Sequence, residues 1–82
     1  MRATDALAAL RQRLAVASGS AGLDAEILVS HVLGVGRAAL AADPARELDS
    51  RQAEILSALA KRRLAGEPVA YLTGRHEFWS LE

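Results

Sequence analysis

The chain of 82 residues contains no cysteine, a single lysine and only three aromatic side chains, one each of phenylalanine, tryptophan and tyrosine. Without cysteine, a disulfide scaffold, catalysis by a thiolate and a cysteine-based zinc site are excluded. No apolar run approaches the roughly 18 residues of a membrane-spanning helix. The start of the chain, Met1 to Asp5, lacks the apolar stretch of a secretory signal. These absences predict a cytoplasmic protein with no membrane partner.

The charges are balanced, because ten basic and ten acidic side chains give a formal net charge of zero. This balance argues against a nucleic acid or an acidic membrane held by bulk electrostatic attraction. The length fits one small domain, and 51% hydrophobic residues are enough for a real core. Eighteen alanines and thirteen leucines, against five valines and two isoleucines, favour helix over sheet.

The first expected helix covers residues 5–17, where leucines recur at three- and four-residue spacing. Thr4 or Asp5 is expected to cap its start, because a short oxygen-bearing side chain can accept the free backbone N–H bonds there. The sequence Ser18-Gly19-Ser20 is expected to stop the helix.

A second helix is expected over residues 21–33, with Gly34 in the left-handed position that closes it. Asp24 and Glu26 lie two residues apart on this helix, so their carboxylates point in different directions and do not form a catalytic pair. The predicted apolar stripe consists of Leu23, Ile27, Leu28, His31 and Val32.

A short third helix is expected over residues 36–42, because Pro44 disfavours helical dihedral angles in the residue before it. The clearest start signal opens a longer helix over residues 50–65: Asp49 is placed as N-cap and Gln52 as its reciprocal partner. Leu48 is expected to pack against Ala53 outside this capping box, and Gly66 to end the helix. The side chains expected to face inward are Leu56, Leu59, Ala60 and Leu64.

The C-terminal part of the chain changes character. Pro68 is typical of a helix start, and residues 69–72 have room for one or two turns before Gly74. Over residues 75–82, polar and apolar side chains alternate in the manner of a strand, with Trp79 on one face and Phe78 on the other. The pattern predicts an all-α bundle of four to five helices followed by a strand that begins a β-hairpin. Without a partner such a strand is expected to fray.

The segment from Gly34 to Ala39 has the G-x-G-x-x-[G/A] spacing of a dinucleotide-binding loop. That motif needs a strand before it, a full helix after it and a second strand that ends in an acidic residue about 20 positions on. The acidic residue at that distance, Glu54, falls inside the capped helix. The glycines are therefore interpreted as a turn between helices.

The sequence His76-Glu77-Phe78-Trp79-Ser80 differs by one residue from the H-E-x-x-H motif of zinc proteases, because a serine replaces the second histidine. We therefore expect no metal site. His31 is interpreted as a packed boundary residue, because no nucleophile motif accompanies it. The run Lys61-Arg62-Arg63 is interpreted as a solvated last turn that complements the helix dipole, the alternative being contact with a phosphate backbone or an acidic protein.

Two stretches of the sequence resemble a known family. The first contains Leu23-Asp24-Ala25-Glu26-Ile27-Leu28, His31-Val32-Leu33-Gly34 and Arg37, and the second runs from Gly66 to Trp79 as GEPVAYLTGRHEFW. The second stretch fits the family pattern G-E-P-[LV]-A-Y-[LI]-x-G-x-x-E-F-[WY]. Through these residues, nearly the whole chain resembles the N-terminal domain of the HemK/PrmC release factor glutamine methyltransferases.

The resemblance implies a two-domain enzyme that transfers a methyl group from S-adenosylmethionine to the glutamine of the Gly-Gly-Gln motif in class-1 peptide chain release factors. A helical N-terminal domain, joined by a β-hairpin to a Rossmann-like methyltransferase domain, would help to recognise the release factor. The family's cofactor loop and Asn-Pro-Pro-Tyr motif lie beyond Glu82. No catalytic, cofactor-binding or metal-binding residue therefore carries over, and S-adenosylmethionine belongs to the longer enzyme.

On this reading, residues 1–74 form the recognition domain and residues 75–82 begin the hairpin linker. Arg11, Arg62 and Arg63 are the candidate contacts with the release factor, while Tyr71, Phe78 and Trp79 are expected to pack the bundle against the hairpin. The alternative is a free-standing helical module that binds protein, or nucleic acid through residues 61–63. The neutral net charge argues against the nucleic acid.

Overall fold

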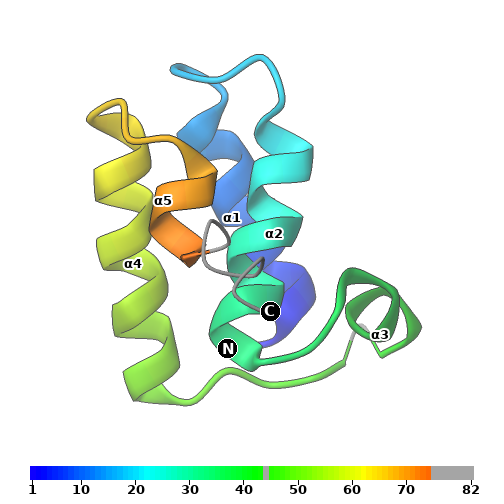
Figure 1. The fold of residues 1–82 in the computed structure, drawn as a ribbon. Coiled ribbons are helices and arrows are strands. Elements are labelled where there is room, and N and C mark those ends of the chain that lie inside the picture. The colour runs from blue at the N-terminus through cyan, green and yellow to red at the C-terminus, as the bar shows by residue number, and fades with distance from the viewer. Residues whose placement is uncertain (44, 75–82) are drawn as a thin grey trace, which may run out of the picture.

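The computed structural model describes residues 1–43 and 45–74, and within them the chain is helical. The five helices of this part are α1 (Ala3–Leu14), α2 (Ala21–Leu33), α3 (Arg37–Ala42), α4 (Ser50–Leu64) and α5 (Val69–Thr73). Figure 1 shows α2 lying along α1, α5 between α2 and α4, and α3 set apart at one corner. The all-α class is confirmed. The predicted strand, with Phe78 and Trp79, lies outside the described residues.

The core lies where α1, α2 and α4 face one another, and α1 makes its main contact with α2. Small alanines on all three helices allow the backbones to approach, and leucines fill the space between them. The buried apolar residues are Ala3, Ala6, Leu10, Leu14, Ala25, Leu28, Val29, Leu40, Leu48, Leu56, Leu59, Ala60 and Leu72. In the described part, no helix is long and apolar enough to cross a membrane.

The start of α1 is held by a distant backbone segment. The N–H of Ala3 donates to the carbonyl of Arg46 at 2.7 Å, and the N–H of Leu48 donates to the carbonyl of Met1 at the same distance. The N-cap residue is Arg2, and no side chain caps the helix. The prediction that Thr4 or Asp5 caps it was wrong, because the backbone carbonyl of Arg46, far along the chain, supplies an acceptor that the local sequence does not reveal.

The other end of α1 and the face of α2 also differ from the prediction. Helix α1 ends at Leu14, not Ala17, and Val16 is 85% exposed in the turn that follows. On α2, Leu23 is 44% exposed and His31 is exposed as well, so neither belongs to the buried stripe as predicted. Because small or apolar residues occur all round this helix, several stripes fit its sequence equally well. Packing against α1 selects the one containing Ala25, Leu28 and Val29.

The turn between α2 and α3 is a Schellman motif built on Gly34. The N–H of Val35 donates to the carbonyl of Ser30, and the N–H of Gly34 donates to the carbonyl of His31. Gly34 has φ 73°, the left-handed conformation that glycine adopts without strain. Gly36 follows as the N-cap of α3. The interpretation of these glycines as a turn between helices is confirmed.

Helix α4 begins with the predicted capping box. The N–H of Gln52 donates to Oδ1 of Asp49 at 2.7 Å, and the N–H of Asp49 donates to Oε1 of Gln52 at 2.9 Å. Leu48 is buried just outside the box, as a staple residue would be. Leu64, predicted to face inward, is 36% exposed, because the core ends before the last turn of α4.

The short helix α5 closes the described part of the chain. Pro68 is its N-cap, and Gly74, with φ 69°, is its left-handed C-cap. The hydroxyl of Thr73 donates to the carbonyl of Val69 at 3.2 Å, and Leu72 is buried in the core. The prediction of one or two turns ended by Gly74 is confirmed.

Candidate functional site

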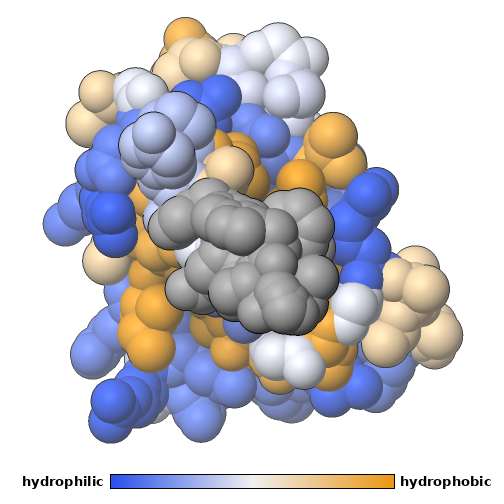
Figure 2. Space-filling model, in the orientation of Figure 1, coloured by the Kyte–Doolittle hydropathy of each residue, from blue (hydrophilic) through white to orange (hydrophobic). Residues whose placement is uncertain are grey.

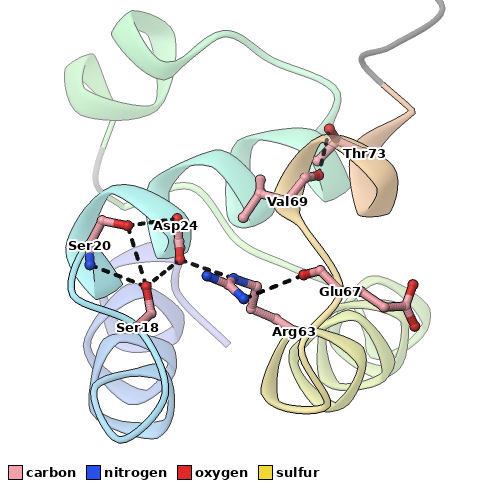
Figure 3. A network of polar contacts seen from close by, with 7 residues as sticks. All are labelled: Ser18, Ser20, Asp24, Arg63, Glu67, Val69 and Thr73. Carbon is pink, nitrogen blue, oxygen red and sulfur yellow. Dashed lines mark hydrogen bonds and ion pairs between the residues drawn. The ribbon is translucent and has the colours of Figure 1, made fainter.

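A partly buried ionic network links the α1–α2 loop and the start of α2 to the end of α4 and the α4–α5 loop (Figure 3). The side chain of Asp24, on the first turns of α2, is only 7% exposed, and its Oδ2 accepts from Nε of Arg63 at 3.2 Å. The hydroxyls of Ser18 and Ser20 donate to the same carboxylate at 2.7 and 3.3 Å. Nη1 of Arg63 also donates to the carbonyl of Glu67 at 3.4 Å.

This network fastens four parts of the chain: the α1–α2 loop, α2, the last turn of α4 and the α4–α5 loop. A partly buried ion pair is tolerated when other donors and acceptors satisfy the remaining oxygens and nitrogens, as the two serines and the Glu67 carbonyl do here. We therefore interpret this network as one that stabilises the fold. The interpretation of residues 61–63 as a solvated last turn was wrong for Arg63, whose side chain is only 20% exposed.

The neighbouring residue, Arg62, forms a second ion pair on the surface. Its Nη2 lies 2.7 Å from Oε1 of Glu67, with the two side chains 51% and 39% exposed. Hydrogen bonding from the guanidinium lowers the pKa of the Glu67 carboxyl, and the same contact raises the pKa of Arg62. Two of the three cations in the basic run are thus paired within the domain.

The predicted contact residues do not come together in one place. Arg11 is exposed on α1 and lines a shallow hollow with Leu7 and Glu26, whereas Arg62 and Arg63 lie at the end of α4. Tyr71, predicted to pack against a hairpin, is 64% exposed on α5. Their roles toward a partner stay predictions.

A larger hollow lies where α2, the α2–α3 turn and α5 meet, and it was not foreseen from the sequence. It has a volume of about 560 Å³. Its walls combine apolar and polar side chains with glycine backbone, and it is called the α2–α5 hollow below. The lining residues are Ile27, Ser30, His31, Gly34, Val35, Gly36, Arg37 and Thr73. The sequence offered one signal of this hollow, which is that the residues around Gly34 and those around Thr73 both carry the family resemblance.

The described residues contain no group of three or more His, Cys, Asp or Glu side chains that could hold a metal ion. The two carboxylates of α2 point to different partners, as predicted: Asp24 to Arg63, and Glu26 to Arg37 at 2.9 Å. Figure 2 shows apolar surface among polar side chains on this face of the domain. The exposed apolar residues of the described part include Leu23 on α2 and Ile55 on α4.

The fold therefore defines a small helical bundle, fastened by a partly buried ion pair and bearing an open hollow beside α5. The family model of the PrmC N-terminal domain matches residues 5–74. The chain belongs to this family, and the resemblance seen in the sequence is confirmed.

Two similar proteins from different bacteria carry the same name. The chain is 50% identical over 72 residues to the release factor glutamine methyltransferase of Coxiella burnetii, covering 88% of this chain and 26% of that protein. It is 51% identical over 65 residues to the protein of the same name from Escherichia coli K12, covering 79% of this chain and 24% of the relative. The chain thus spans about a quarter of the length of these relatives. No solved structure gives a significant match.

Proposed function

We propose that this chain is the substrate-recognition domain of a protein-(glutamine-N5) methyltransferase. The enzyme would transfer a methyl group from S-adenosylmethionine to the Gly-Gly-Gln glutamine of a class-1 peptide chain release factor. The observation that carries the proposal is about 50% identity, over most of this chain, to proteins named release factor glutamine methyltransferase. The cofactor and the methyl transfer are assigned to the longer enzyme, and this domain binds the protein substrate.

A separate binding domain is useful because the target is one glutamine on a large protein. A second contact converts the encounter at the active site into an intramolecular one and raises the effective concentration of the glutamine there. A rigid bundle suits this role, since little conformational entropy is lost when a preformed surface binds. The domain is expected to lower the KM for the release factor and to leave kcat nearly unchanged.

Two of the predicted contact residues have side chains exposed on the surface. Arg11 is exposed on α1, and Arg62 is half exposed at the end of α4. Arg63 is held by Asp24 inside the domain, so its substitution would act on stability before it acted on binding. The same pairing weakens the alternative of a nucleic-acid site at residues 61–63, because Arg62 and Arg63 are already matched by carboxylates.

A domain exchange in the Escherichia coli relative tests the proposal. Its matched segment is replaced by this chain or deleted, and methylation of an intact release factor is compared with methylation of a short Gly-Gly-Gln peptide. We expect the exchanged enzyme to retain most of its kcat/KM on the release factor. The deleted enzyme should lose at least tenfold through KM, with the peptide methylated equally by both. Equal kcat/KM on the intact release factor, with and without the domain, would contradict the proposal.

A pair of charge variants sharpens the result. In the exchanged enzyme, Arg11→Ser is expected to raise the KM for the release factor. Arg51→Ser, which removes an exposed arginine from the first turn of α4, serves as the matched control. An equal change of KM in both variants would show a general charge effect and remove Arg11 from the contact surface.

A further inference from the structure

A shallow groove runs over the side of the bundle where α1, α2 and α3 meet. It combines two hollows, of about 90 and 200 Å³, that share Leu7 and Glu26 in their linings. Apolar side chains form its floor, because Leu7 is half-buried and Leu40 is buried. Helix α3, which packs mainly against α2 and stands at one corner of the bundle, forms its far wall (Figure 1). We call it the α1–α3 groove and define it by Leu7, Arg11, Gly22, Glu26, Leu40 and Ala41.

The charges around this groove are not fully matched. Oε1 of Glu26 accepts from Nε and Nη2 of Arg37, at 3.1 and 2.9 Å, so these two side chains neutralise each other. Arg11, in contrast, forms no ion pair with any residue that the structure describes. The groove therefore carries one net positive charge, and Arg11 is its source. An acidic group is the complement that such a surface lacks.

The side chain of Arg11 is also held in place before anything binds. Its stem lies against the backbone of α2 at Gly22, where an added Cβ atom would be 3.8 Å from Cδ of Arg11. A side chain that is already restricted loses less conformational entropy when it binds a partner. Its planar guanidinium can then hold a carboxylate through two parallel hydrogen bonds.

We propose that the α1–α3 groove binds an acidic segment of the protein substrate. A carboxylate of that segment pairs with Arg11, and an apolar side chain beside it packs on Leu7 and Leu40. The hollows are smaller than the roughly 300–1,000 Å³ of pockets for small-molecule ligands, so they fit single side chains of a protein partner. Arginine next to an apolar pocket is typical of the residues that dominate protein–protein binding. This inference rests on the proposed function, which supplies the release factor as the partner.

The test is an amide-resolved NMR titration of the 82-residue chain with a class-1 release factor, which gives both a map of shifts and a Kd. We expect the largest shifts at the residues that define the groove. Ala41→Gln puts a polar side chain over the apolar floor and should raise the Kd at least fivefold. Ala39→Gln is the matched control, because Ala39 is also exposed on α3 but lines neither hollow. Its Kd should stay within twofold of the unmodified chain.

A second set of variants tests the carboxylate contact. Arg11→Gln should raise the Kd at least tenfold, and Arg11→Lys, which keeps the charge but not the planar fork, should lose less. Arg13→Gln is the control on the same helix, since Arg13 is exposed and lines neither hollow. Circular dichroism of each variant checks that the helices remain.

The outcomes separate this inference from the proposed function. Shifts that gather away from the groove, for example around Arg62, would overturn the groove as the binding site and leave the recognition role standing. Equal Kd values for Ala41→Gln and Ala39→Gln, or for Arg11→Gln and Arg13→Gln, would overturn it as well. The absence of any shift in the unmodified chain would contradict the recognition role itself, and the groove proposal would fall with it.

Discussion

Arg62 and Arg63 are neighbours in the last turn of α4, and each pairs with a carboxylate, yet the two pairs differ in almost every physical respect. Arg62 meets Glu67, five residues along the chain, with both side chains largely in water. Arg63 meets Asp24, 39 residues away, with side-chain exposures of 20% and 7%. Successive residues of a helix point about 100° apart, and here that rotation separates the solvent from the inside of the bundle.

This difference shows that the contribution of an ion pair to stability depends on how far the pair is buried. An exposed pair is screened by water and salt and contributes little to stability. In a partly buried pair, loss of one partner leaves the other with an uncompensated charge, which costs several kcal/mol when burial is complete. In the basic run at residues 61–63, we therefore expect Arg63 to be needed for the stability of the fold and Arg62 not to be.

The largest expected effect comes from Arg63→Met, which keeps the apolar stem of the side chain and removes its charge. We expect a loss of about 2–3 kcal/mol in the free energy of unfolding, because Asp24 loses its counter-ion at a position away from water. For a domain of this size, the loss corresponds to a fall of at least about 8 °C in Tm. Chemical and thermal unfolding followed by circular dichroism measure both quantities.

The matched control is Arg62→Met, the same substitution one position earlier, for which we expect no resolvable change in Tm. Equal Tm losses in the two variants would show that the distinction between the buried and the exposed pair has no energetic meaning. A double substitution of Asp24 and Arg63 by apolar residues should recover part of the loss, because it leaves no unpaired charge inside.

A smaller effect is expected at the start of α4, where Asp49→Ala removes the cap. The expected cost is about 1 kcal/mol, since the N–H of Gln52 loses its acceptor. Asp5→Ala is the control, because the start of α1 is held by backbone and not by this side chain. Urea unfolding compares the two variants, and an equal or larger loss for Asp5→Ala would show that the side chain does cap α1.

The smallest effect concerns the pH dependence at Glu67. Because Arg62 lowers the pKa of this carboxyl in the folded state, the pair stabilises the fold above the ordinary pKa of glutamate. That contribution is lost as the pH falls through the lowered value. NMR titration should give a Glu67 midpoint below that of an unperturbed glutamate, and Arg62→Met should raise it. An unchanged midpoint in the variant would mean that the hydrogen bond is absent in solution.

Local signals allowed much of the fold to be predicted from the sequence. The capping box of Asp49 and Gln52 and the glycine stop at Gly34 involve residues a few positions apart, so their geometry is contained in the sequence itself. The face of α2 could not be assigned, because its sequence fits several apolar stripes. The prediction for the start of α1 failed for a related reason, since the N–H of Ala3 donates to the carbonyl of Arg46, far along the chain.

The candidate site was harder to predict from the sequence, because its contacts also join residues that lie far apart in the chain. The partner of Arg63 is Asp24, and no rule of spacing joins two charged residues that far apart in the chain. The α2–α5 hollow forms only when the turn at Gly34 and Gly36 is brought beside Thr73. Tertiary packing decides these features, and the exposure of Tyr71 likewise becomes visible only in the folded domain.

The most direct test of the recognition role is an amide-resolved NMR titration of this chain with a class-1 release factor. If the domain binds the release factor, we expect shifts that gather on one face of the bundle and include the surroundings of Arg11 or Arg62, with weak affinity and no methyl transfer. The absence of any shift at sub-millimolar concentrations of both proteins would contradict a recognition role. In that case the domain would serve to brace the rest of the enzyme, and recognition of the release factor would lie elsewhere.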